Sequence, residues 1–181
     1  MRLAFVPAIV AMLIALTTTA FAADKENTLY IDLKDGRVVI EMRPDLAPKH
    51  VAQIKKLVRE GKYNGVVFHR VIEGFMAQTG DPDGTGMGGM GDKLPAEFSR
   101  EPHVRGTVSM ARTSEPGSAR SQFFICFAPA PSLDGQYTVW GKVVSGMEFV
   151  DKIKKGAPGS GAVAPPADKM LKVQVAADVK N

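Results

Sequence analysis

The stretch FHRVIEGFMAQTGD, from Phe68 to Asp81, decides how the whole chain is interpreted. Its first half alternates as a β-strand does, which places Phe68, Arg70 and Ile72 on one face. A long cationic side chain such as Arg70 is unusual on the same face as apolar residues, and two explanations are possible. One reason is a surface salt bridge, and the other is an arginine that points into an apolar groove. The residues of this stretch leave both open.

Two later stretches repeat the mixture of polar donors with aromatic or apolar side chains. The first is SQFFI, residues 121–125. The second is LDGQY, residues 133–137, followed by VWGKV at 139–143. By composition alone, the apolar members of these stretches belong to a hydrophobic core more often than to a binding site.

Short strands separated by turns, with two helices, account for the rest of the chain. Alternation and β-branched residues predict strands at 28–33, 37–42, 66–72, 75–79, 108–111, 123–127, 138–143 and 171–175. Apolar residues at helical spacing predict a helix between Pro48 and Gly61, and the pattern Ser145-x-x-Glu148 predicts a capping box before a second helix. Eight antiparallel strands can close into a barrel, but the pattern leaves barrel and sandwich as equal alternatives.

Composition excludes several classes of protein. The chain has 181 residues, 45% of them hydrophobic and 23% charged, which is typical of one globular domain. A single cysteine excludes a disulfide framework and a four-thiolate zinc site. Cys126 is flanked by aromatic and apolar residues, so we expect a buried thiol. The net charge of +4 has no Lys/Arg tract, so nucleic acid is not an expected partner.

The N-terminus has the pattern of a secretory signal peptide. Arg2 precedes an apolar run of 14 residues, Leu3 to Leu16, and Ala20-Phe21-Ala22 matches a cleavage site. An uncleaved anchor is the alternative, but 14 helical residues span about 21 Å, short of a hydrocarbon core of roughly 30 Å. We therefore expect a signal peptide at 1–22, a single domain at 23–181, and no stable membrane association after cleavage.

Weaker motifs point to cofactors but lack the necessary context. Gly84-x-Gly86-x-x-Gly89 has the spelling of a dinucleotide fingerprint, yet more glycines and Pro95 follow where a helix is needed. The acidic residues that begin at Asp81 only faintly match a calcium loop, and the three histidines have no ligand spacing. We expect neither a metal nor a cofactor.

The three stretches, taken together, resemble the cyclophilins, a family of peptidyl-prolyl cis/trans isomerases. The motifs occur in family order: FHRxIxGFMxQxGD at 68–81, GTG at 84–86, SMA at 109–111, SQFFI at 121–125, LDG at 133–135 and GKV at 141–143. The resemblance runs from Thr28 to Val175, and the compact loops look like the bacterial branch. It implies a mainly β fold: a closed eight-stranded antiparallel barrel capped by two α-helices.

The resemblance also implies roles for individual residues. Arg70 matches the family's catalytic arginine. Positions that match the walls of its proline pocket are Phe75, Met76, Phe124 and Leu133. Positions that match its groove for the substrate backbone and the neighbouring residue are Gln78, Gly84, Ala111 and Gln122.

Three positions depart from the eukaryotic pattern of the family. Ser132 stands where a tryptophan is usual, so tight binding of the inhibitor cyclosporin is not expected. Tyr137 replaces a histidine but still offers a ring with a polar tip. Arg112 replaces an asparagine, and its side chain can alter the preference around the proline. We still expect Tyr137 and Arg112 to contact the substrate.

The function that follows is isomerisation of Xaa-Pro bonds without a covalent intermediate, to assist the folding of exported proteins. The expected partners are proline-containing unfolded or extended polypeptides, the expected location is the periplasm, and the protein is expected to be a monomer. Two alternatives remain at this point: a binding module for proline-containing segments with negligible turnover, and an oxidoreductase that uses the glycine loop. The intact arginine at position 70 favours catalysis over binding alone.

Overall fold

Alternation of apolar residues sets the register of the first hairpin. The computed structural model describes residues 24–180, so the predicted signal peptide and its cleavage site lie outside the described residues. Strand β1 (Thr28–Leu33) pairs antiparallel with β2 (Gly36–Met42), and Ile31 lies opposite Val38. Both side chains are buried, because in each strand every second residue faces the core.

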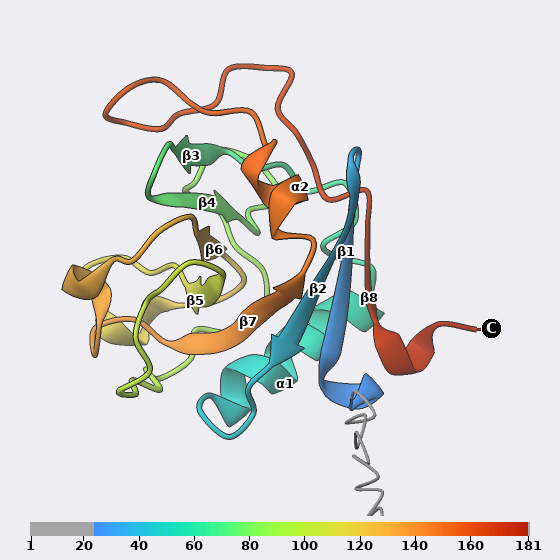
Figure 1. Cartoon of the computed structure of the whole chain (residues 1–181). Coiled ribbons are helices and arrows are strands. Elements are labelled where there is room, and N and C mark those ends of the chain that lie inside the picture. Colours follow the sequence, from blue (N-terminus) through green and yellow to red (C-terminus); the bar gives the residue numbers. More distant parts are fainter. Residues whose placement is uncertain (1–23, 181) are drawn as a thin grey trace, which may run out of the picture.

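Six further strands extend this hairpin into one antiparallel sheet, which curls strongly (Figure 1). They are β3 (Arg70–Ile72), β4 (Met76–Thr79), β5 (Thr107–Met110), β6 (Phe123–Cys126), β7 (Val139–Ser145) and β8 (Lys172–Val175). The strand order is β3-β4-β6-β5-β7-β2-β1-β8. The prediction of eight antiparallel strands with two α-helices is confirmed, and the sheet takes the form of a strongly curled half-barrel with β3 and β8 at its two edges.

The two edge strands, β3 and β8, do not pair with each other. An irregular segment, residues 161–170, leads into β8 and is hydrogen-bonded to the chain at and just before β3. The N–H of Phe68 donates to the carbonyl of Asp168 at 2.8 Å, and the N–H of Val71 donates to that of Gly161 at 2.7 Å. Prolines within residues 161–170 lack an N–H and cannot continue a ladder. The predicted strand at 66–72 is therefore a strand only at 70–72.

Helix α1 (Pro48–Arg59) packs its apolar side against the sheet, burying the residues that predicted it. Its N-cap, Ala47, offers no side-chain acceptor. The carboxylate of Glu97 accepts instead from the backbone N–H groups of Lys49 and His50, each at 3.1 Å. A residue distant in sequence thus satisfies the free donors of the helix N-terminus.

Helix α2 (Met147–Asp151) begins without the predicted capping box, so that prediction was wrong. Its N-cap is Gly146, in the left-handed conformation with φ +83°, and no side chain caps the helix. Ser145 still pairs with Val39 at the end of β7, so its backbone belongs to the sheet. A Cβ at position 146 would collide with the carbonyl of Arg37, which requires glycine there.

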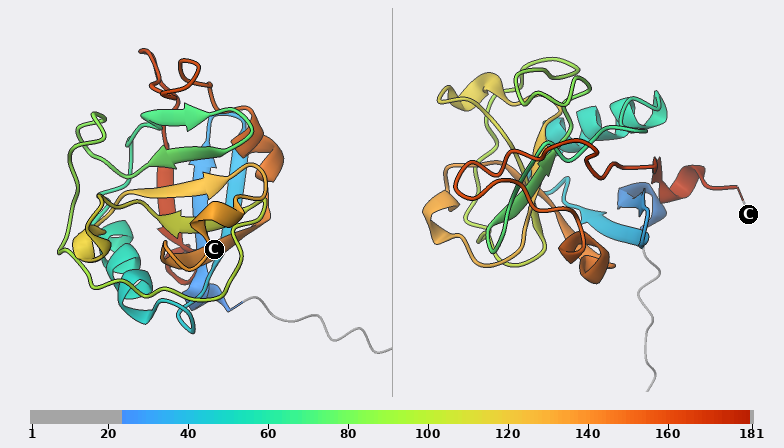
Figure 2. Two further views of the ribbon diagram at one scale, coloured as in Figure 1. Left: turned by 90° about the vertical axis from the view of Figure 1, so that its left-hand side faces the viewer. Right: turned by 90° about the horizontal axis from the view of Figure 1, so that it is seen from above.

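The two α-helices lie on opposite sides of the curled sheet (Figure 2). Between the sheet and α1, Trp140 packs edge-on against Phe123 with ring centroids 5.3 Å apart, and Tyr63 packs edge-on against the same phenyl ring. Four 3₁₀ turns complete the described chain: η1 (Lys25–Asn27), η2 (Pro116–Ser118), η3 (Pro131–Leu133) and η4 (Ala176–Asp178). No helix within residues 24–180 has the length and apolar character to span a membrane.

Candidate functional site

Arg70 stands on the outer strand β3 and is held by two hydrogen bonds. Its Nε donates to the carbonyl of Ser160 at 3.1 Å, and its Nη1 donates to Oε1 of Gln78 at 3.2 Å. Gln78 lies directly opposite on β4. Nη2 makes no hydrogen bond to the described residues, which leaves a charged donor for a ligand. Of the two interpretations of this arginine, the salt bridge is not formed within residues 24–180.

A chain of amides continues from this arginine across the sheet. Nε2 of Gln78 donates to Oε1 of Gln122 at 2.9 Å, and Nε2 of Gln122 donates to the carbonyls of Gly86 and Gly88 at 3.0 and 2.8 Å. Each amide accepts through its oxygen and donates through its nitrogen, so the whole chain has one consistent direction. The guanidinium is thereby linked through two side chains to residues 80–91, which we call the glycine-rich loop.

A second hydrophobic cluster, separate from the main core, has members on β3, β4 and β6. We call it the apolar cluster. Its buried members are Met76, Phe124 and Cys126, and its partly buried members are Ile72, Phe75, Ala111, Leu133 and Tyr137. Six of these eight residues were predicted site residues from the resemblance. Ile72 was placed on the face of Arg70 by alternation, and Cys126 was predicted only as a buried thiol.

The thiol of Cys126 is fully buried and is not a nucleophile poised for reaction. Burial raises its pKa to about 12. A thiolate is the reactive form of cysteine, and such a pKa leaves almost none at neutral pH. The prediction of a small buried hydrophobe at position 126 is confirmed.

The ring of His103 packs against two aromatic members of the apolar cluster, a role that the sequence did not indicate. Its ring stacks on Phe124 with centroids 6.1 Å apart and meets Tyr137 edge-on at 6.4 Å. Its Nδ1 lies 3.0 Å from Oδ1 of Asp134, and its Nε2 lies 3.0 Å from Oγ of Ser109. Hydrogen bonds from the backbone and ring of His103 lower the pKa of Asp134. His103 therefore connects two aromatic members of the apolar cluster to Asp134 and Ser109.

The side chain of Arg112 is immobilised beside the cluster. Its guanidinium lies over the ring of Tyr137, 4.5 Å from the centroid. Nε and Nη2 donate to the carbonyl of Gln136 at 3.0 and 2.9 Å. The two departures from the family pattern at positions 112 and 137 therefore contact each other.

Gly84 is a predicted site residue that belongs to neither the apolar cluster nor the lining of the polar cavity described below. A Cβ there would meet a methyl group of Val67 at 2.9 Å. The glycine-rich loop is organised by the buried carboxylate of Asp81, which accepts from the N–H groups of Asp83, Gly86 and Gly88. Burial alone would raise the pKa of Asp81, but these hydrogen bonds outweigh it and hold that pKa below its ordinary value.

A cavity of about 460 Å³ adjoins the amide chain, and we call it the polar cavity. Its lining comes from β4, the glycine-rich loop and residues 111–122, and it includes the predicted residues Gln78, Ala111, Arg112 and Gln122. Ala111 also belongs to the apolar cluster. The two features therefore share a border, as adjacent subsites for one extended chain would.

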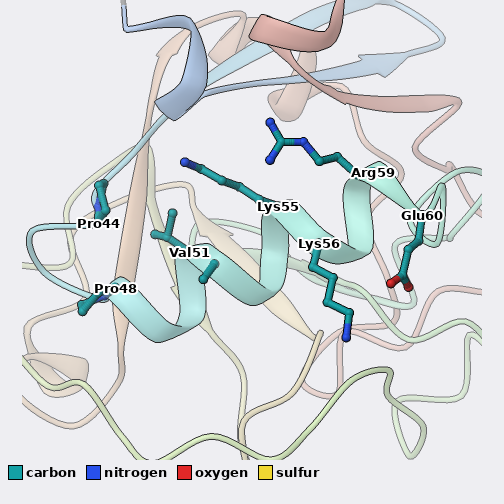
Figure 3. A pocket seen from close by; sticks show the side chains of 8 residues that line it. Pro44, Pro48, Val51, Lys55, Lys56, Arg59 and Glu60 are labelled. Carbon is teal, nitrogen blue, oxygen red and sulfur yellow. The ribbon is translucent and has the colours of Figure 1, made fainter.

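A different cavity, of about 600 Å³, lies along α1 and contains none of the predicted site residues (Figure 3). Two cations in its lining, Lys55 and Arg59, are already paired within the chain. Nζ of Lys55 lies 3.3 Å from a carboxylate oxygen of Glu26, and Nη2 of Arg59 lies 2.9 Å from the other. This cavity is therefore a poor candidate for the chemistry of the protein.

The weaker motifs for a metal or a dinucleotide gain no supporting context from the described residues. No group of three or more His, Cys, Asp or Glu side chains within residues 24–180 is arranged to hold a metal ion. The glycine motif at 84–89 leads into a loop rather than the α-helix that a pyrophosphate would need. The side chains that converge are a guanidinium, two amides and an apolar surface.

Comparisons with known proteins point to one family. The family model described as cyclophilin type peptidyl-prolyl cis-trans isomerase/CLD matches residues 28–175. A probable peptidyl-prolyl cis-trans isomerase of Brucella suis is 59% identical over 96% of this chain and 94% of its own length. A cyclophilin from Hirschia baltica has a similar structure, with a TM-score of 0.77 and 29% identity over 87% of this chain and 77% of that one. A cyclophilin-type isomerase of Cryptosporidium parvum, crystallised with the dipeptide Ala-Pro, has a TM-score of 0.75 and 28% identity over 85% of this chain and 99% of that one.

Proposed function

This chain belongs to the cyclophilin family of peptidyl-prolyl cis-trans isomerases, and we propose that it isomerises Xaa-Pro bonds non-covalently, with Arg70 as the catalytic donor. The fold class inferred from the sequence, a cyclophilin-like antiparallel sheet with two helices, is the fold observed. What the proposal adds to the family assignment is a role for each side chain in the site.

The reaction needs no nucleophile, base or metal. Rotation about a prolyl bond is slow because twisting breaks amide resonance, which sets a barrier of about 18–20 kcal/mol. In the twisted state the prolyl nitrogen regains a lone pair and becomes a better hydrogen-bond acceptor. A donor placed at that nitrogen binds the transition state more tightly than the planar ground state, and so accelerates rotation.

Arg70 suits this role because its guanidinium stays charged at any relevant pH. Two of its nitrogens are anchored, to Ser160 and Gln78, while Nη2 has no partner among the described residues. This combination of a fixed arginine and an unused donor beside the apolar cluster is the observation that carries the proposal. One charged hydrogen bond supplies about 1.5–3 kcal/mol of the stabilisation.

The apolar cluster supplies the second part of the mechanism by gripping the proline ring. Its partly buried members, among them Phe75, Leu133 and Tyr137, present an apolar surface to solvent. Holding the ring still lets the preceding carbonyl rotate, and excluding water favours the twisted amide, which is less polar than the planar one. The amides of Gln78 and Gln122 can bind the backbone on the neighbouring side. An Ala-Pro dipeptide accompanies the related Cryptosporidium enzyme, which supports a proline-containing peptide as the ligand.

Cis/trans exchange of an Ala-Pro peptide, measured by NMR, tests this mechanism. The parent protein is compared with Arg70→Ala and Arg70→Lys at equal concentration. We expect fast exchange with the parent, a loss of about ten- to a hundredfold with Arg70→Ala, and a smaller loss with Arg70→Lys. Binding without acceleration by the parent would favour a proline-binding module instead. Equal acceleration by all three proteins would leave an isomerase but refute the role of Arg70.

We further propose that the protein assists the folding of exported polypeptides in the periplasm. The support is the signal-peptide pattern at residues 1–22. Expression of the full chain in a Gram-negative host, followed by fractionation and mass spectrometry, tests this. We expect a periplasmic product that begins near Ala23, and an intact chain retained in the cytoplasm would contradict the proposal.

A further inference from the structure

The polar cavity carries charges that the isomerase mechanism does not use. Its lining includes three cations, Lys93, Arg112 and Arg120, and one carboxylate, Glu115. The cavity borders the apolar cluster through Ala111 and the amide chain through Gln78 and Gln122. A substrate whose proline sits in the apolar cluster would extend a flanking residue toward this cavity.

Four arginines outside the polar cavity are paired with carboxylates. The pairs join Arg37 to Asp32, Arg43 to Asp45, Arg59 to Asp178 and Arg105 to Asp151. The three cations of the polar cavity have no carboxylate partner within residues 24–180. Arg112 and Arg120 donate to backbone carbonyls only. The cavity therefore carries a net positive charge, three cations against the one carboxylate of Glu115, and none of these cations forms a salt bridge within the described residues.

Two of these cations are held in place before any ligand arrives. Arg112 is stacked on Tyr137 and bonded to the carbonyl of Gln136. Nε of Arg120 donates to the carbonyl of Gly91 at 3.0 Å, while its two terminal nitrogens make no hydrogen bond to the described residues. A donor that is already ordered loses little conformational entropy when a ligand binds, so its charge is used efficiently. The two terminal nitrogens of Arg120 present paired donors that match a carboxylate. Arg112 contributes mainly its charge, because its three nitrogens already donate to the carbonyls of Gln136, Thr113 and Ser114.

We propose that the polar cavity selects substrates with an acidic residue close to the proline. The carboxylate of an Asp or Glu side chain would bind between Lys93, Arg112 and Arg120, and Glu115 would weaken this preference by repulsion. The inference rests on the proposed function, because it assumes that a peptide occupies the apolar cluster. It adds a class of preferred substrate, acidic proline-containing segments.

Matched peptides that differ only in charge test the preference. Asp is compared with Asn at each position from three residues before to two residues after the proline of an Ala-Pro peptide. Exchange rates give kcat/KM, and NMR titration gives Kd. At one position we expect Asp to be preferred about three- to tenfold, which is the range of partly exposed ion pairs, and we expect high salt to reduce the ratio.

Variants locate the preference in the cavity. Lys93→Gln and Arg120→Gln are each expected to lower the Asp/Asn ratio, and Glu115→Gln is expected to raise it. Lys172→Gln, an exposed cation on β8, is the control and should leave the ratio unchanged. An Asp/Asn ratio near one at every position would overturn the inference, as would a preference that survives both Lys93→Gln and Arg120→Gln.

The outcome also separates this inference from the mechanism. If the protein accelerates both peptides equally, isomerase function stands and the acidic preference fails. If it accelerates neither peptide, the mechanism fails, but the Asp/Asn ratio of Kd still decides whether the cavity selects carboxylates.

Discussion

Nη1 of Arg70 donates a hydrogen bond to Oε1 of Gln78 at 3.2 Å, across the antiparallel pair in which the two residues lie opposite each other. This bond links the guanidinium to the amide chain, and through it to the glycine-rich loop. Gln78 is therefore a positioning residue for Arg70, as well as part of the lining of the polar cavity.

Replacing Gln78 by Leu should reduce kcat/KM about tenfold, because a misplaced donor loses much of its effect on the transition state. The part of the loss that comes from the misplaced guanidinium should fall on kcat, whereas the lost contact of the amide with the substrate backbone should raise KM. In the Arg70→Ala background the same replacement should cost less, because only the contact with the substrate backbone is then lost. Additive losses in this double-mutant cycle would show that Gln78 acts independently of Arg70.

The ring of Tyr137, rather than its hydroxyl, should matter for activity. The ring packs edge-on against Phe124 at 5.8 Å and lies under the guanidinium of Arg112, whereas its hydroxyl makes no hydrogen bond to the described residues. Tyr137→Phe should keep kcat/KM within about twofold, while Tyr137→Ala should lose about tenfold, since aromatic pairs contribute about 0.5–1.5 kcal/mol beyond burial. A large loss in Tyr137→Phe would assign a role to the hydroxyl instead.

Asp81 should make the fold sensitive to acid. Its hydrogen bonds lower the folded-state pKa below the unfolded value, so its stabilisation is fully present above about pH 4 and is lost as the pH falls through the folded pKa. Asp81→Asn should lower the free energy of unfolding at pH 7 by about 2 kcal/mol and flatten its decline in acid. Urea denaturation between pH 7 and pH 2 measures both effects. The exposed Asp92→Asn is the matched control, and an identical acid profile in the two variants would contradict this role.

Cys126 should not react with a thiol reagent in the native protein. Its side chain is fully buried, and burial raises its pKa to about 12. We expect no labelling by a disulfide-forming chromogenic reagent at pH 8, and one equivalent of labelling in denaturant. Prompt labelling of the folded protein would show that the apolar cluster opens readily.

Cyclosporin should bind weakly, because Ser132 stands where the family usually has tryptophan. Ser132 lies in η3 and its side chain is exposed, so a larger residue can be accommodated. Ser132→Trp should tighten binding about tenfold, through added apolar contact and an indole N–H donor. Calorimetric titration of both proteins measures this, with Ser132→Ala as a control expected to match the parent. Tight binding by the parent would refute the expectation.

Periodicity was the most reliable guide to the secondary structure. Alternation in β1 and β2 and helical spacing in α1 predicted elements that the structure confirms to within about two residues. The predictions that were wrong concern residues whose conformation is set by tertiary contacts with other parts of the chain rather than by local periodicity. Residues 66–69 alternate as a strand, but they face the irregular segment at 161–170. Ser145 has a side chain that can cap a helix, but its backbone is part of β7, where it pairs with Val39.

The sequence by itself determined most of the strand and helix pattern and, through its resemblance to the cyclophilins, the family, and it predicted which residues form the site. Only the tertiary structure decided how those side chains meet. It linked Gln122, far from Arg70 in sequence, to that arginine through Gln78, and it stacked the ring of His103 on Phe124. The physical reason is that local pattern encodes which face of a strand a residue occupies. Hydrogen bonds between distant side chains depend instead on strand register and on how the sheet curls, which the whole chain sets together.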